Sequence, residues 1–212
     1  DNASSSFGTF QLLRGSSDFD VRHNLQGALT YEVPGTYTNP VVSAILKHWA
    51  FDVRVSARSA FPVNILGPFS FDPSSGQRIY FQPNFVSGQP LYLYGSQYPG
   101  GRIINFQAFQ AAPPGTQGNV PRNNARGFGA FQADLAIRRE FRIREPLRLQ
   151  LRAEAFNVFN HPNFAAITNT LSSGPKAFGY ATNTLNNSLS GLNALYQLGG
   201  PRSLQVALKL LF

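Results

Sequence analysis

Three histidines are the first candidates for catalysis or metal binding. His23, His48 and His161 are far apart in the sequence, so none supplies the closely spaced partner ligands that a zinc site requires. His161 belongs to an asparagine- and proline-rich stretch, residues 160–163, and such clusters are typical of turns. We therefore interpret His161 as a turn residue where a strand ends.

Two carboxylates, Asp18 and Asp20, have the alternate spacing of oxygen ligands in calcium loops. The other ligands and the glycine of such a loop are missing, which favours a solvated segment leading into a strand and leaves calcium as the weaker alternative. The sequence also contains no Gly-x-Ser-x-Gly elbow, phosphate loop, His-Glu zinc motif or cysteine. We expect no catalytic residue, cofactor or metal, and therefore no enzyme.

Opposite charges that recur at every second position indicate a different kind of site. Residues 131–143 and 147–155 each alternate apolar with polar side chains, and the tight turn at residues 144–146 joins them. This pattern predicts a β-hairpin with matched faces. The simpler interpretation of these charges is that they form cross-strand ion pairs on the wall of a water-filled lumen. The more specific interpretation is that they contact a polar substrate or a plug. The lumen-facing candidates are Asp134, Arg138, Arg148, Arg152 and Glu154.

Three further segments show the same period of two. Residues 24–33, 49–58 and 203–212 alternate strictly, so each predicts a strand with one apolar face. Residues 40–47 are predicted to form a short helix between the first two strands. The apolar segments between residues 65 and 109 are predicted to add hairpins above a membrane rather than within it.

The connections between the predicted strands alternate in length. A moderate connection is followed by a very long one at residues 60–128, by the tight turn, and by a second long one that includes residues 164–200. Outer-membrane barrels have long loops outside and short turns in the periplasm. The fold class expected is all-β, an antiparallel meander of long strands that forms part of a transmembrane β-barrel with long extracellular loops. Five crossings cannot close such a barrel, so we expect further strands upstream.

Composition narrows the class of protein. The 212 residues are 42% hydrophobic and only 13% charged, and no uninterrupted apolar run is long enough for a spanning helix. The net charge of +8 comes from scattered lysines and arginines, so no nucleic-acid partner is expected. The absence of cysteine fits an oxidising compartment. Because the sequence starts without a leader, we expect its N-terminal end to be a cut.

Four stretches resemble a known family. They are Ser-Asp-Phe-Asp-Val-Arg-His-Asn at residues 17–24, Asn-Asn-Ala-Arg-Gly-Phe-Gly at 123–129, Ala-Glu-Ala-Phe-Asn-Val-Phe-Asn-His-Pro-Asn-Phe at 153–164, and the ending at 202–212. In this order they resemble the barrel end of TonB-dependent outer-membrane receptors, most of all the subgroup with a carboxypeptidase-regulatory-like N-terminal domain. The resemblance covers residues 17–212, and the run at 156–164 is its most specific part.

The resemblance implies that residues 1–212 are the C-terminal portion of a 22-stranded barrel in the bacterial outer membrane. It also implies energised uptake of a scarce nutrient, and as partners a plug domain, the remaining barrel strands, the TonB complex, outer-membrane lipid and lipopolysaccharide. The barrel assembly machinery is a further expected partner, because the last strand ends on an aromatic residue as its recognition signals do. The residues assigned to that assembly signal are Leu204, Val206, Leu208, Leu210 and Phe212.

Aromatic residues near strand ends are expected to form the belts of a membrane barrel. Leu149 is expected to face lipid at the midplane and Gln150 the lumen. Two other functions stay open at this stage: a passive porin or structural barrel, and a secreted β-sandwich that binds carbohydrate through Tyr92, Tyr94 and Tyr98. The belt residues are Tyr31, Trp49, Phe51, Phe141 and Phe159.

Overall fold

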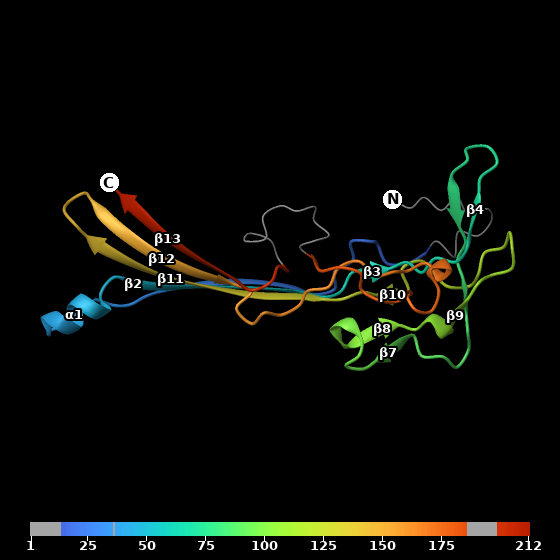
Figure 1. Cartoon of the computed structure of the whole chain (residues 1–212), viewed down its shortest axis with the longest axis horizontal. Coiled ribbons are helices and arrows are strands. Elements are labelled where there is room, and N and C mark those ends of the chain that lie inside the picture. The colour runs from blue at the N-terminus through green and yellow to red at the C-terminus, as the bar shows by residue number, and fades with distance from the viewer. Residues whose placement is uncertain (1–13, 36, 186–198) are drawn as a thin grey trace.

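The structure, a computed structural model, describes residues 14–35, 37–185 and 199–212. A long, twisted antiparallel sheet lies at one end and a cap of folded loops lies at the other (Figure 1). The sheet has five strands in the order β1-β2-β11-β12-β13. Their bounds are β1 Asn24–Glu32, β2 Trp49–Arg58, β11 Ala130–Arg142, β12 Arg148–Phe156 and β13 Ser203–Leu211.

These strands confirm the five segments predicted from alternation, with ends shifted by one residue or so. The predicted helix is also present as α1 (Pro40–Leu46). The Asn39 side chain caps it by accepting hydrogen bonds from the backbone N–H groups of Val41 and Val42, and Pro40 has the fixed φ that suits a first helical position. No helix within the described ranges is long and apolar enough to cross a membrane.

The connections divide between the two ends of the sheet as their lengths predict. Helix α1 and the β11–β12 turn lie at one end, together with the C-terminus (Figure 1). The described parts of the two long connections, β2–β11 and β12–β13, lie at the opposite end and form the cap. The alternation of long and short connections is therefore confirmed.

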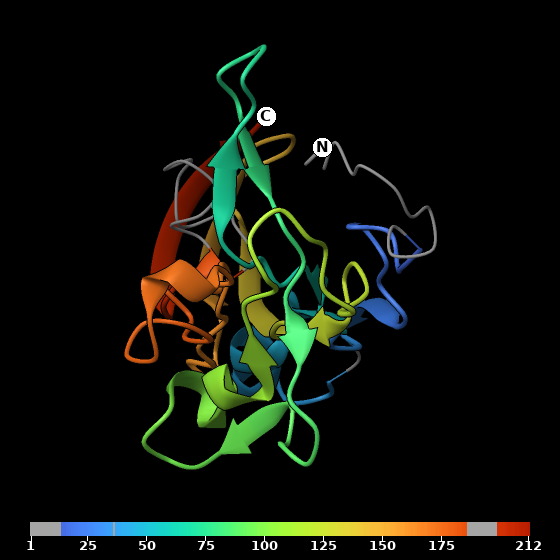
Figure 2. The ribbon, with the colours of Figure 1, turned by 90° about the vertical axis from the view of Figure 1, so that its right-hand side faces the viewer.

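The cap contains short strand pairs of its own, as predicted for the apolar segments (Figure 2). None of these strands joins the five-stranded sheet. The pairs are β3 (Pro62–Val63) with β10 (Ala125–Arg126), β4 (Phe69–Phe71) with β5 (Arg78–Tyr80), β6 (Asn84–Phe85) with β9 (Phe109–Gln110), and β7 (Tyr92–Tyr94) with β8 (Arg102–Ile104). Three single-turn helices accompany them: η1 (Pro99–Gly101), η2 (Phe106–Ala108) and η3 (Leu171–Ser173).

The main hydrophobic core of the described chain lies in the cap rather than on the sheet. Phe178 has no exposed surface and packs edge-on against the rings of Phe106 and Phe109, with centroids 5.5 and 5.9 Å away. Burial of such rings drives the loops to fold. The buried members of this core are Ile65, Ile104, Ala108, Phe109, Val120, Ala125, Leu171 and Phe178.

The sheet, by contrast, is a wall with one polar and one apolar face. The register aligns apolar residues across all five strands, for example Leu29, Val53, Leu135, Ala155 and Leu204 in one row. This apolar face is open, and the large side chains along its edges are largely exposed. Such a surface requires an apolar environment that the described chain does not supply.

Labelling at the two ends of the sheet tests which end faces the outside of the cell. Ser87 is exposed in a turn of the cap, and a cysteine placed there would be the sole cysteine of this sequence. We expect Ser87→Cys in the intact protein to react with an impermeant maleimide on whole cells, because long barrel loops face outward. A cysteine replacing Arg144 in the β11–β12 turn is the control and should react only after lysis. The reverse pattern would invert the orientation.

Candidate lumen wall and loop clasp

The polar face of the sheet carries the charges that the sequence singled out. Asp134, Arg138, Arg148, Arg152 and Glu154 all project from this face, because each aligns in register with other polar-face positions. The structure thus places all five on one face of the sheet. Their contacts show which of them pair.

Arg138 forms its ion pair with Glu32, which is two strands away, and not with the residue opposite it in register. In register it is opposite Arg152, which would be a repulsive pair, and Ala50 lies on its other side. Across Ala50 the Arg138 guanidinium lies 3.3 Å from a carboxylate oxygen of Glu32 on β1. Glu32, Ala50 and Arg138 lie in one register row, and the small alanine side chain leaves the space that the ion pair occupies.

Arg152 lies at the centre of a second group. Its guanidinium is 2.8 Å from Glu154 on its own strand and 3.8 Å from Asp52 on β2. The Asp52 carboxylate also accepts a 2.8 Å hydrogen bond from the Thr30 hydroxyl. Ala136, which separates Asp52 from β12 in the register, leaves room as Ala50 does. These pairs are partly exposed, so each contributes little to stability, and together they form a charged, hydrated surface.

The other two candidates have different roles. Arg148 lies 3.6 Å from Glu140, which also accepts a hydrogen bond of 3.0 Å from the Gln150 amide. Asp134 forms no ion pair with an arginine in the structure. It accepts hydrogen bonds from the Gln132 side chain at 2.8 Å and from the Asn157 backbone N–H at 2.9 Å. Asp134 therefore anchors the outer end of the hairpin.

The partners Glu32 and Asp52 were not singled out from the sequence. Alternation had placed both on polar faces, but the pairing of β2 with β11 spans a very long connection and cannot be read from periodicity. Once this pairing is known, both residues fall beside the predicted arginines.

The most specific stretch of the sequence fixes the outer end of this wall. Beyond the last β11–β12 pair, the Val158 N–H donates to the Ala133 carbonyl at 2.9 Å. The fully buried Asn163 side chain then pairs with both backbone groups of Phe131, accepting from its N–H at 2.7 Å and donating to its carbonyl at 3.0 Å. Asn163 thus takes the place of a neighbouring strand.

Asn157 is the second anchor in this stretch. Its side chain is 2% exposed and donates to the carbonyls of His161 and Gly200 at 3.0 and 2.8 Å, while accepting from the His161 N–H at 3.0 Å. Its φ of 48° is left-handed, a conformation that asparagine tolerates better than most residues. His161 lies in the loop directly after the turn at Val158 and Phe159, and its ring packs edge-on against Phe131.

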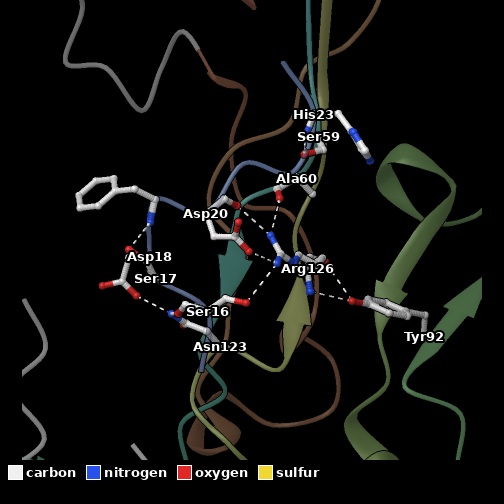
Figure 3. Close-up of polar contacts among 11 residues, drawn as sticks. Ser16, Ser17, Asp18, Asp20, His23, Ser59, Ala60, Tyr92, Asn123 and Arg126 are labelled. Carbon is white, nitrogen blue, oxygen red and sulfur yellow. Dashed lines mark hydrogen bonds and ion pairs between the residues drawn. The ribbon is translucent and has the colours of Figure 1, made fainter. Parts of the chain in front are cut away.

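A second group of contacts, the clasp, holds the segment before β1 against the cap (Figure 3). The Arg126 guanidinium forms an ion pair with Asp20 and donates to the carbonyls of Asp20 and Ala60 at 2.8 and 3.3 Å. The Asn123 amide donates to the Ser16 carbonyl and to Asp18, each at 2.7 Å. We define the clasp as Asp18, Asp20, Asn123 and Arg126. It joins two of the stretches that carry the family resemblance.

Both clasp aspartates are stabilised in their charged form. The hydrogen bond from Asn123, with the nearby Arg122, lowers the pKa of Asp18, and the hydrogen bond from Arg126 lowers the pKa of Asp20. Their contribution to folding is therefore present above the usual carboxylate range and is lost as the pH falls through the lowered pKa. No group of three or more metal-binding side chains occurs in the described part of the chain, and arginines hold the carboxylates that calcium would need.

A hollow of about 470 Å³ lies between the clasp and the β12–β13 connection. Arg58, on the polar face at the end of β2, lines it and stacks 4.3 Å over the Phe61 ring. Phe128 and Phe164 line it together, with ring centroids 5.2 Å apart. Its volume is within the range of small-molecule sites.

An alternating wall, exposed on its apolar face and capped at one end, has the features of part of an outer-membrane barrel. The comparison with protein families matches residues 3–205 to the outer membrane beta barrel domain. The chain belongs to this family. No curated protein and no solved structure matches it.

Membership in the barrel family places the protein in the bacterial outer membrane, with the apolar face of the sheet against lipid. The belt residues fit this placement. The belt residue Phe141 lies near the turn end of β11, and Phe131, whose ring centroid is 6.1 Å from that of the belt residue Phe159, lies near the cap end. Phe131 was not among the predicted belt residues. Phe131 and Phe141 are ten positions apart, about 33 Å along a strand. A tilt of about 40° shortens this distance to about 25 Å, the height of the apolar band.

The secreted β-sandwich is wrong for this barrel domain. Among the described residues no second sheet covers the apolar face. The tyrosines proposed to bind carbohydrate are also partly engaged within the cap: the Tyr92 hydroxyl accepts from the Arg126 N–H at 2.7 Å, and the Tyr98 ring packs against Tyr180.

The predicted position of Leu149 at the membrane midplane is wrong. Leu149 lies on the lipid-facing side as predicted, but it aligns with Phe141 and Leu210 close to the β11–β12 turn. It therefore lies near the membrane interface and not at the midplane. Gln150 lies on the lumen face as predicted.

The residues of the predicted assembly signal lie along the outer edge of the sheet. Leu204, Val206, Leu208 and Leu210 project from the lipid-facing side of β13, which pairs only with β12 among the described strands. Phe212 follows the strand directly and is 91% exposed. Recognition of this strand by assembly machinery stays a prediction.

Proposed function

We propose that this barrel domain is the C-terminal part of a TonB-dependent receptor that takes up a scarce nutrient and has no enzymatic activity. The proposal rests on the four sequence stretches that resemble such receptors. Two of them form the clasp and a third fixes the outer end of the wall. The sheet is open at β1 and β13 within the described ranges, so the proposal assigns closure to further strands of a longer polypeptide.

The observation that carries the proposal is the folded cap at the outer end of the lumen wall. A passive pore needs no preformed recess in its outer loops, whereas this cap has a hydrophobic core and a partly open hollow of about 470 Å³ lined by Arg58 and aromatic rings. Binding a scarce solute before transport requires a preformed surface of this kind. We propose that the hollow contributes to the initial binding of the nutrient.

The charged lumen wall supports the same function. A TonB-dependent receptor holds a plug inside its barrel, and a hydrated surface of paired charges allows that plug to shift without leaving buried charges unpaired. Charged side chains of both signs provide such a surface on this wall, among them Arg138, Arg152, Asp52 and Glu154. Lipid and lipopolysaccharide are proposed to contact the opposite face.

Conductance separates this proposal from the passive porin. We expect the intact protein in a planar lipid bilayer to show no steady channel openings, because a plug fills the lumen. Deleting the plug domain should produce large and stable openings. Steady openings of the intact protein would favour the porin, and a full-length sequence without a plug domain would contradict the proposal outright.

A further inference from the structure

Helix α1 presents an apolar surface that no described part of the chain covers. None of its residues is buried, although it occupies a connection of only moderate length between two strands. Val41 is 65% exposed and Ile45 is 57% exposed. A turn that faced only water would be expected to be polar. The exposed apolar side chains are Val41, Val42, Ile45 and Leu46.

Two side chains show on which side of the wall the helix lies. The Trp49 indole N–H donates to the Ile45 carbonyl at 2.7 Å, and the Arg139 guanidinium donates to the Ala44 carbonyl. Trp49 and Arg139 are register partners, and both project from the lipid-facing side of the sheet. The last turn of α1 therefore lies on the lipid side and not over the lumen.

Arg139 also indicates the depth of the helix. It is the one charged residue on the lipid-facing side of the five strands, where arginine costs about 2 to 4 kcal/mol at the midplane but about 0 to 1 kcal/mol at the interface. Its guanidinium lies between the rings of Trp49 and Phe141, 5.1 and 4.7 Å from their centroids. Tryptophan is itself enriched at the interface. Both residues therefore place the helix at the level of lipid headgroups.

We propose that α1 is an interfacial helix that lies in the phospholipid leaflet on the periplasmic side of the outer membrane. Val41, Ile45 and Leu46 insert among the outer segments of the acyl chains, continuous with the lipid-facing side of the sheet. With seven residues the helix is only about 10 Å long and cannot span a leaflet, and the interface residues Arg139 and Trp49 tether its last turn. We therefore place the helix along the membrane plane.

Nitroxide labels test this placement. The sequence has no cysteine, so Val41→Cys or Ile45→Cys introduces a unique site within it, and any cysteine elsewhere in the intact protein is replaced by serine. The labelled protein is folded into vesicles of phosphatidylethanolamine and phosphatidylglycerol. Collision rates with oxygen, which concentrates in lipid, are then compared with those of a water-soluble nickel chelate. Leu29→Cys on the lipid-facing strand β1 and Arg144→Cys in the other turn give the lipid and water references.

We expect both helix labels to be mobile and to favour oxygen, shifted from the Arg144→Cys value toward the Leu29→Cys value. Labels as accessible to nickel as Arg144→Cys would place the helix in water and overturn the proposal. Immobile labels shielded from both reagents would also overturn it, because they would show protein covering the helix. In Arg139→Gln the Ile45 label should gain mobility while the Leu29 label does not change. An unchanged Ile45 label would overturn the tether.

Discussion

Replacing Leu135 with arginine is expected to lower the free energy of unfolding of the intact barrel by about 2 to 4 kcal/mol. Leu135 projects from the lipid-facing side of the central strand β11, in one row with Val53 and Ala155. Its row lies about midway between the aromatic ends of β11, Phe131 and Phe141. A guanidinium at this position contacts neither water nor an acidic partner. The free-energy cost is large because the position is near the membrane midplane.

The neighbouring position provides the matched control. Ala136 lies on the lumen face, opposite Asp52 on one side and Glu154 on the other. Arginine at Ala136 occupies the space across which Arg152 reaches Asp52, but that partly exposed pair contributes little to stability. Two carboxylates are within reach of the new guanidinium in a hydrated wall, so the cost should stay below about 1 kcal/mol. Leu149→Arg, near the interface, should cost only about 0 to 1 kcal/mol. Denaturant unfolding in lipid vesicles measures all three, and equal losses for Leu135→Arg and Ala136→Arg would contradict the assigned faces.

The sequence was sufficient to predict the wall but not its partners. Period-two alternation located all five strands, the face of each and the side on which Leu149 and Gln150 lie, because alternation records which environment each side chain meets. Alternation does not show how deep in the membrane a residue lies. Leu149 was placed at the midplane for this reason, and only its alignment with Phe141 shows otherwise.

The cap was predicted to contain hairpins, but its core was not. Phe178 and Ile65 belong to connections that are far apart in sequence, and they meet only because β2 pairs with β11 and β12 with β13. Long-range contacts between irregular segments have no periodicity to read. The clasp was missed in the same way: Asp18 and Asp20 were compared with calcium ligands, while their partners Asn123 and Arg126 lay on a distant loop.

Arg139 was missed for the opposite reason, since it interrupts a pattern. The strand was predicted over residues 131–143, but at position 139 an arginine stands where the alternation requires an apolar residue, and no role was predicted for it. The structure shows that Arg139 belongs to the apolar face, where its guanidinium lies over the rings of Trp49 and Phe141. An arginine that breaks the alternation near a strand end is therefore a signal for the membrane interface.

Asn157→Ala is expected to lower the free energy of unfolding by about 2 to 4 kcal/mol, although residue 157 contacts neither lumen nor lipid. Alanine removes two donors and one acceptor from a buried site and leaves the Gly200 carbonyl, itself buried, without its 2.8 Å partner. It also has to adopt the left-handed φ of 48°. The connection from β12 to β13 should loosen, so proteolysis within the cap should accelerate more than the global stability loss explains.

Two further variants separate the two causes of this loss. Asn157→Gly removes the same hydrogen bonds but tolerates the left-handed backbone, so it should be more stable than Asn157→Ala by about 1 kcal/mol. Asn183→Ala deletes a side chain whose oxygen accepts one exposed hydrogen bond of 3.2 Å, from the Ala166 N–H, and should change stability by less than about 0.5 kcal/mol. If Asn157→Ala were as mild as Asn183→Ala, the asparagine-rich stretch that most resembles the receptor family would not be fixing the outer end of the wall. Contact with a ligand or plug would then be the alternative role of this stretch.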